Sequence, residues 1–317
     1  MSNENSNADN RNMPNRFLNS EPSMQRSFDD ICVDALRMLQ EKMNFGLWMV
    51  TKVDGDDWIV MKSHDSAYGV QDGDVFVWME SFCSRMVRGL GPTFAPESDK
   101  VIAYAQAEIG RKIPIQAYIG FPLYREDGEL LGTVCAIDQK PVPESWSEHQ
   151  GFVEEIAAEL SEVYRRDYKQ ALCSAKERAA KAEADDLLEV LLSHDWESLI
   201  DVHEDEARSK GIAYSIIVAK ADISLRVDAD LTNSLNKVIG RDNFVVYHGK
   251  GLYSMLLADC NAPKLDAFVD LIRTTFEALN VRFHVGYATR SDAHGLNHAY
   301  DQALGKVLAQ ELRNRAA

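Results

Sequence analysis

Hydrophobic and polar residues follow two different periods along the chain, and together they predict an α+β protein. Apolar residues recur every three or four positions over 28–43, which predicts an amphipathic helix. Residues 78–90 have the same helical spacing, and 93–95 read as a short strand. Short apolar runs bounded by turn residues predict two β-hairpins, 47–53 with 58–62 and 115–123 with 130–138.

The second half of the chain opens with a long helical stretch, 150–192, that contains no proline. Its later apolar positions step by four and three, which predicts a thin coiled-coil seam: Tyr168, Leu172, Ala175, Ala179 and Ala182. We therefore expect a homodimer through residues 160–192; the alternative is a solvated linker helix.

Apolar runs at 214–222 and 281–288 then predict buried strands, and a third run, 244–257, is interrupted by two glycines. The interruption predicts a hairpin whose tip uses the left-handed backbone conformation that Gly249 and Gly251 allow. These runs predict a central antiparallel sheet.

Composition and charge narrow the possible partners. The 317 residues carry a formal net charge of −16, which disfavours binding to nucleic acid or to anionic membranes. No apolar stretch is long enough to span a bilayer, and residues 1–26 read as a disordered tail rich in Asn and Ser. The five cysteines show no paired CxxC spacing, so we expect a cytoplasmic protein with reduced thiols and no metal site.

Three segments of the N-terminal half carry a family resemblance. They are Ser81-Phe82-Cys83-Ser84-Arg85-Met86-Val87, Phe121-Pro122-Leu123 with Asp127-Gly128, and Gly132-Thr133-Val134-Cys135-Ala136-Ile137-Asp138. Together with the predicted order of elements, they resemble a GAF domain, which we place at 27–150, with a connecting helix at 151–194. The resemblance implies a small-ligand pocket or a dimerisation module.

The resemblance also suggests which residues would line such a pocket: Trp78, Phe82, Cys83, Tyr104, Ile113, Tyr118 and Cys135. Ordinary core packing is the alternative for each of them. Cys83 is followed by Ser84 and not by the His that often follows a bilin-attaching cysteine, so a tetrapyrrole is not expected. We expect no cofactor, and the ligand of this pocket stays unknown.

Residues 195–317 resemble, in the order and pattern of their segments, the GGDEF domain of diguanylate cyclases. Aligned on that family, Lys220 takes the position of the first metal-binding Asp, and Asp222 keeps the second Asp. At the hairpin, the five signature positions are occupied by His248, Gly249, Lys250, Gly251 and Leu252. Lys306 matches the phosphate-contacting lysine of the last helix, although a surface lysine is the simpler interpretation.

The substitutions at these positions predict a degenerate domain without catalytic residues. A protonated lysine does not bind Mg²⁺, and glycine offers no side chain to do so. Lys220 and Gly251 therefore remove two metal-binding carboxylates. Lys220 and Lys250 could instead bind the phosphates of a nucleotide without a metal.

The sequence thus predicts a non-catalytic signalling protein with a sensing or dimerising N-terminal domain. The C-terminal domain would bind an unidentified protein partner or a nucleotide. Three alternatives remain: a diguanylate cyclase with an atypical active site, a redox enzyme centred on the first domain, and a scaffold that dimerises without a ligand.

Overall fold

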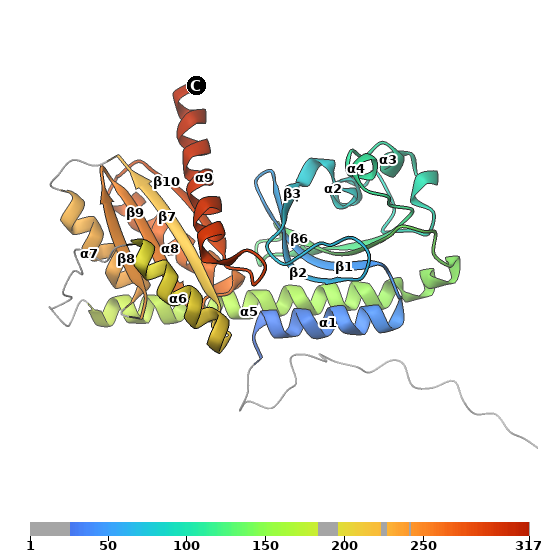
Figure 1. The fold of residues 1–317 in the computed structure, drawn as a ribbon, viewed down its shortest axis with the longest axis horizontal. Coiled ribbons are helices and arrows are strands. Elements are labelled where there is room, and N and C mark those ends of the chain that lie inside the picture. Colours follow the sequence, from blue (N-terminus) through green and yellow to red (C-terminus); the bar gives the residue numbers. More distant parts are fainter. Residues whose placement is uncertain (1–25, 183–195, 223–226, 241, 317) are drawn as a thin grey trace, which may run out of the picture.

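The computed structural model describes residues 26–182, 196–222, 227–240 and 242–316. The chain forms two domains, each built on one antiparallel sheet, and a long helix runs along both of them (Figure 1). The predicted α+β class, with its long helix and second antiparallel domain, is confirmed. The predicted tail and the part of the long helix predicted at 183–192 lie outside the described residues.

The N-terminal sheet contains six strands in the order β3-β2-β1-β6-β5-β4. Their bounds are β1 Leu47–Asp54, β2 Asp57–Asp65, β3 Val75–Val77, β4 Phe94–Ala95, β5 Ala117–Tyr124 and β6 Leu130–Asp138. Both predicted hairpins are confirmed, since β1 pairs with β2 and β5 pairs with β6. Between them, β1 pairs with β6, so the two hairpins meet at the centre of the sheet.

Two layers of helix cover the two faces of this sheet. On one face, α1 (Phe28–Lys42) and α5 (Gln150–Ala182) pack against alternate strand residues such as Trp48 and Val134. The other face packs against the short helices α2 (Phe82–Val87), α3 (Ile102–Ala105) and α4 (Ile109–Lys112) (Figure 1). The period-two pattern of the strands thus supplies a core on each side.

The prediction of a single helix over 78–90 is wrong in one respect, because the chain forms two separate helical segments there. A short 3₁₀ turn, Trp78–Glu80, precedes α2, and Ser81 between them has extended backbone angles. The Ser81 hydroxyl accepts a hydrogen bond from the backbone N–H of Ser84 at 2.9 Å. Ser81 therefore acts as an N-cap that starts a new helix, a role for which serine is well suited.

The C-terminal sheet has the strand order β10-β7-β9-β8. Its elements are α6 Trp196–Lys210, β7 Tyr214–Ala221, α7 Val227–Ile239, β8 Phe244–Gly249, β9 Leu252–Ala258, α8 Ala262–Ala278, β10 Phe283–Thr289 and α9 Gly295–Ala316. One face packs against α7, α8 and the end of α5, and the other against α6 and α9. A Cβ at Gly286 would lie 1.9 Å from the carbonyl oxygen of Ala303, so glycine lets α9 approach β10 closely.

The face of α5 that was predicted to form a coiled-coil seam contacts the chain's own C-terminal domain. The Tyr168 hydroxyl donates a hydrogen bond to Asp270 on α8 at 2.7 Å, and Ala175 is buried in the C-terminal core. Two of the seam positions therefore have an intramolecular partner in this structure. The coiled coil itself stays a prediction.

The two domains also contact each other directly through buried polar side chains. Lys52 on β1 pairs with Asp266 on α8, and each residue is only 4% exposed. Asp266 also accepts hydrogen bonds from Tyr164 on α5 and from Arg125 in the β5–β6 turn. Lys52 and Arg125 belong to the N-terminal domain and Tyr164 to α5, so this carboxylate joins α8 to both of them. We call Lys52, Arg125, Tyr164 and Asp266 the interdomain cluster.

Candidate functional site

The N-terminal domain contains a cavity of about 230 Å³ between its sheet and the short helices α2 and α4. Its wall is mostly apolar, and five of the seven predicted pocket residues lie on it: Phe82, Cys83, Ile113, Tyr118 and Cys135. The other two predicted residues pack close to this group. Tyr104 stacks on Phe82 with ring centroids 4.8 Å apart, and Trp78 contacts Trp58 with centroids 6.4 Å apart.

The wall also includes strand residues that the sequence analysis did not select. They are Leu47, Met49, Trp58, Phe76 and Ile137, with Ile109 and Ile115 from the segment before β5. Strand alternation could have found some of them, because Met49 lies opposite Cys135 and Leu47 opposite Ile137 in the β1–β6 pairing. Tyr68, Gly69, Val70 and Asp74 come from the loop between β2 and β3, for which the hydrophobic pattern gave no signal.

Few polar side chains belong to this wall, and one of its residues has an unsatisfied polar group. The indole N–H of Trp58 is buried and has no hydrogen-bond partner among the described residues. A buried donor without a partner costs roughly 1–3 kcal/mol. The Tyr118 hydroxyl donates to the sulfur of Cys83 at 3.5 Å, and burial raises the pKa of Tyr118. The cavity therefore suits a small, mainly apolar molecule.

The two cysteines of the wall are both buried, but their pKa values shift in opposite directions. Burial opposes ionisation of Cys83, and hydrogen bonds with Cys135, Thr133 and Tyr118 outweigh it and lower the pKa of Cys83. Cys83 and Cys135 contact each other, and this hydrogen bond together with burial raises the pKa of Cys135. Since the thiolate is the reactive form, a raised pKa keeps the Cys135 thiol unreactive at neutral pH. All five cysteines lie in the described part of the chain, and Cys173 on α5 is the exposed one.

We predict that a thiol reagent such as Ellman's reagent modifies one cysteine rapidly in the folded protein and the other four slowly. Cys173 should be the rapid site, because the remaining thiols are buried. The Cys173→Ser variant should lose the rapid phase, and urea should expose the other four. Rapid modification of a second thiol in the variant would show that the core around Cys83 and Cys135 is open to the reagent.

The second candidate site is the β8–β9 hairpin. Gly249 pairs with Leu252, which leaves a two-residue turn, and its residues Lys250 and Gly251 have φ of 53° and 76°. This is the two-residue turn with two left-handed positions that hairpins favour. The predicted left-handed glycines are confirmed, since Gly249 has φ of 86°. Lys250 adopts the same conformation although it has a side chain.

The hairpin brings several of the aligned positions together. Lys220 on β7 lies opposite Leu252, and its ammonium group donates to the carbonyl oxygen of Lys250. Asp222 follows β7, and its backbone N–H donates to the backbone carbonyl oxygen of Arg282 at 2.9 Å. The His248 ring bonds to the hydroxyl of Ser254 at 2.9 Å, and burial lowers the pKa of this histidine.

Lys306 belongs to a different environment from the hairpin. Its ammonium group lies 3.0 Å from Asp54 and 3.6 Å from Asp57, both in the turn between β1 and β2. It also lies over the ring of Tyr287, 5.2 Å from the centroid. The structure thus places Lys306 at the interface between the domains and its charge against two carboxylates of the N-terminal domain.

The residues that the structure describes contain no group of three or more His, Cys, Asp and Glu side chains arranged to hold a metal ion. None of the described helices is both long enough and apolar enough to cross a membrane.

Comparison with known proteins identifies the first domain. The GAF domain model matches residues 27–163, whereas no curated protein matches the chain. Solved structures with similar folds include a DGC protein from Thermotoga maritima, at 12% identity and a TM-score of 0.33, covering 35% of this chain and 91% of that one. The chromophore-binding domain of a bacteriophytochrome from R. palustris matches at 15% identity and a TM-score of 0.35, covering 43% and 54%.

A free methionine-R-sulfoxide reductase from Neisseria meningitidis matches at 14% identity and a TM-score of 0.35, covering 44% of this chain and 80% of that one. Likenesses this weak carry no information about function. The family model is independent of them and spans the whole six-stranded sheet and the start of α5. Residues 27–163 are therefore a GAF domain, and the apolar cavity lies inside it.

Proposed function

We propose that this protein is a ligand-responsive signalling protein, in which the GAF cavity binds a small apolar molecule and the C-terminal domain is a non-catalytic output. A GAF domain points to a sensing or signalling role. The observation that carries the proposal is the cavity of about 230 Å³ between the sheet and the short helices. Cavities of about 150 Å³ with apolar walls already bind benzene or xenon in proteins.

The size and chemistry of the cavity favour one class of ligand. Pockets for drug-sized ligands usually measure about 300–1,000 Å³, so this one suits a single-ring molecule better than a nucleotide or a tetrapyrrole. The indole N–H of Trp58 is buried behind the wall and unsatisfied, so a ligand acceptor that reaches it by a small shift of the surrounding side chains would gain a hydrogen bond. A monocyclic aromatic molecule with one ether or carbonyl oxygen meets both conditions.

Anisole and ethylbenzene test this ligand class, because they have nearly the same shape and differ in one acceptor oxygen. We expect the full chain to bind both in NMR titrations, with anisole tighter by about tenfold if the oxygen satisfies Trp58. Trp58→Phe should abolish the difference between the two ligands. Equal affinities in the unmodified chain would refute the role of the acceptor oxygen. If neither molecule bound at millimolar concentration, the proposal that the cavity binds ligands of this class would be refuted.

A cavity-filling variant tests where these probes bind. Ile115→Trp places a large ring on the cavity wall and should block anisole binding. Ile102→Trp is the matched control, because Ile102 lies outside the cavity and is 74% exposed. Binding that survives in Ile115→Trp would place the probe elsewhere on the protein.

The C-terminal domain is proposed to be a degenerate GGDEF domain. A buried strand, a hairpin, a second strand and a final helix occur in the order that this resemblance requires, as β7, β8–β9, β10 and α9. At the hairpin, the ammonium group of Lys220 and the bare backbone of Gly251 stand where the family has metal-binding carboxylates. A cation at this position supports the proposal that the C-terminal domain binds a partner protein or a nucleotide and catalyses no metal-dependent reaction.

The activity test is incubation of the full chain with GTP and Mg²⁺ or Mn²⁺. We expect no cyclic di-GMP. If the product forms, and if Lys250→Ala abolishes it, the atypical cyclase becomes the correct interpretation. Equilibrium dialysis with GTP and cyclic di-GMP separately tests nucleotide binding by Lys220 and Lys250.

A homodimer through residues 160–192 remains part of the proposal, in competition with the packing described above. Tyr168 and Ala175 contact the C-terminal domain of the same chain. A dimer that used these positions would have to separate that domain from α5. Sedimentation velocity with the Tyr168→Ala variant, which loses the bond to Asp270, should show a larger dimer fraction if the two arrangements exchange.

A further inference from the structure

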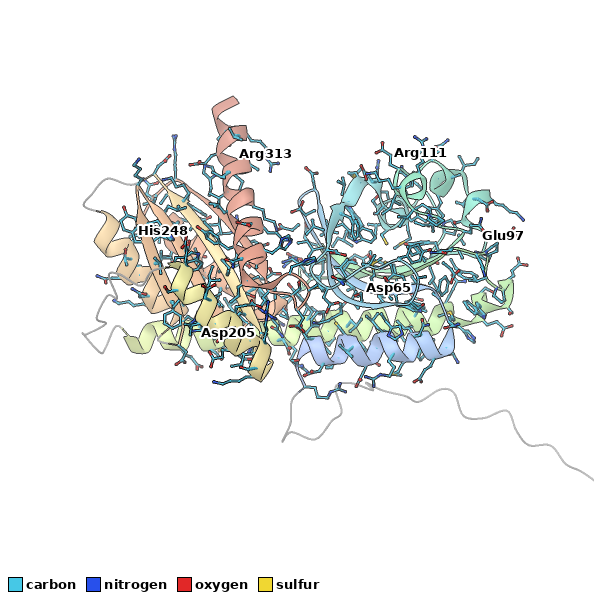
Figure 2. All side chains as sticks on the ribbon, in the orientation of Figure 1. Asp65, Glu97, Arg111, Asp205, His248 and Arg313 are labelled. Carbon is cyan, nitrogen blue, oxygen red and sulfur yellow. The ribbon has the colours of Figure 1, made fainter. Side chains whose placement is uncertain are left out.

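One loop of the GAF domain lines the cavity and also contacts the C-terminal domain. We call residues 66–74, between β2 and β3, the coupling loop. Its residues Tyr68, Gly69, Val70 and Asp74 form part of the cavity wall. Figure 2 labels Asp65, which ends β2 just before this segment, and the two oxygens of its carboxylate accept the backbone N–H groups of Ala67, Tyr68 and Val70.

The end of the coupling loop contacts the other domain. The Asp74 carboxylate lies 3.0 Å from the Nε2 atom of His294. Gly73 has φ of 89°, and a Cβ there would come within 2.9 Å of the side chain of Ser291. We call residues 290–294, which connect β10 to α9, the docking loop. These two contacts join the coupling loop to the docking loop.

The docking loop is in turn fixed to the helices that flank the hairpin. Arg290 donates two hydrogen bonds of 2.9 Å to Glu204 on α6, and the hydrogen bonds from Arg290 lower the pKa of Glu204 to about 2. Glu204 also accepts the backbone N–H of Leu296 at the start of α9. Glu204 therefore links the docking loop to both α6 and α9.

The same two helices, α6 and α9, also connect to the β8–β9 hairpin. Trp196 at the start of α6 contacts the His248 ring edge-on, with centroids 6.0 Å apart, and contacts Tyr300 of α9 at 5.3 Å. Figure 2 shows that Asp65 and His248 lie on different domains, so the contacts from coupling loop to docking loop connect two separate sites.

Occupation of the cavity should restrain the coupling loop. An empty cavity leaves Gly69 and Val70 without packing partners on one side, and a ligand would supply them. A loop that is already restrained loses less entropy when it docks, which makes the two events favourable to each other. By thermodynamic reciprocity, docking must then raise the affinity of the cavity by the same factor.

We propose that the contact of Asp74 and Gly73 with His294 and Ser291 couples the GAF cavity to the C-terminal domain, so that ligand binding and domain docking stabilise each other. The ligand part of this inference rests on the proposed function of the cavity. His294 is a positioning residue in this scheme, because it lies outside the cavity and acts through Asp74. Signal transfer then uses a direct contact between the domains in addition to α5.

The test compares the full-length chain with its His294→Ala variant. Titration with anisole measures the affinity of the cavity, and hydrogen exchange with mass spectrometry measures the opening of residues 66–74 without any ligand. His284→Ala is the control, since His284 is a histidine of the same domain that pairs with Lys220 on β7. Circular dichroism and thermal melting confirm that both variants remain folded.

The expected result is a loss of anisole affinity of at least about fivefold in His294→Ala, the lower end of typical coupling, and no change in His284→Ala. Peptides covering 66–74 should also exchange at least about fivefold faster in His294→Ala. Unchanged exchange in these peptides would overturn the coupling, whether or not anisole binds. Absence of anisole binding in the unmodified chain, with faster exchange in the variant, would refute the ligand class and leave the contact between the loops standing.

Discussion

Replacing Lys52 by methionine should lower the free energy of unfolding by about 3–5 kcal/mol, because the buried carboxylate of Asp266 loses its one buried cation among the described residues. Asp266 is 4% exposed, and Lys52 is its buried partner from β1. Arg125 remains at 3.4 Å, and Tyr164 still donates its hydroxyl, so the carboxylate keeps two weaker partners. Urea-induced unfolding, followed by circular dichroism, measures the change.

Two further variants separate the loss of the ion pair from the loss of packing. Lys52→Met combined with Asp266→Leu removes both charges and should recover much of the stability, since apolar replacements of buried ion pairs are often neutral. Lys62→Met is the control for a lysine on the same sheet, whose ion pairs are partly exposed and should contribute roughly 0–1 kcal/mol. A change below about 1 kcal/mol in Lys52→Met would contradict the burial of the pair.

The protein should unfold steeply above about pH 10, because buried tyrosines hold their protons more tightly in the folded chain. Burial raises the pKa of Tyr118, Tyr164 and Tyr287 above the ordinary value of 10.0. At a pH above that value the unfolded chain has lost these protons and the folded chain still binds them. Stability is therefore complete below about pH 10 and falls as pH rises, by about 1.4 kcal/mol per pH unit for each tyrosine.

These three tyrosines alone lower the free energy of unfolding by about 4 kcal/mol for each pH unit above about 10. That is a large part of the roughly 5–15 kcal/mol by which a typical protein is stable. The absorbance of tyrosinate and the circular dichroism signal should consequently change together during an alkaline titration. Tyr118→Phe keeps the ring and should reduce the slope by about 1.4 kcal/mol per pH unit. Tyrosines that ionise gradually near pH 10 while the fold persists would show that their hydroxyls are in contact with solvent.

The hydrophobic pattern was sufficient to predict the hairpins and much of the cavity, because strand alternation assigns each residue to one face of the sheet. Cys83, Tyr118 and Cys135 follow from such local patterns and from the GAF resemblance. The coupling loop was not predictable in this way. Its wall residues have no repeating pattern, and their positions depend on the carboxylate of Asp65 and on the second domain.

Contacts between the domains were also beyond the sequence analysis, for a different reason. Lys52 and Asp266 are 214 positions apart, and each looks like an ordinary surface charge in its own segment. An apolar stripe such as the one through Tyr168 and Ala175 shows that a helix face is covered but does not say by which chain. Lys306 illustrates the same limit, since its carboxylate partners belong to the other domain.

The continuity of α5 through both hydrophobic cores restricts how this chain can vary in length. Leu160 is buried in the first core and Ala175 in the second, and the helix is unbroken between them. One residue inserted between them would rotate the second core by about 100° relative to the first, because a helix has about 3.6 residues per turn. The two domains are therefore held at a fixed rotation about α5. Only insertions or deletions close to a whole number of turns, such as about seven or about eleven residues, would preserve that rotation.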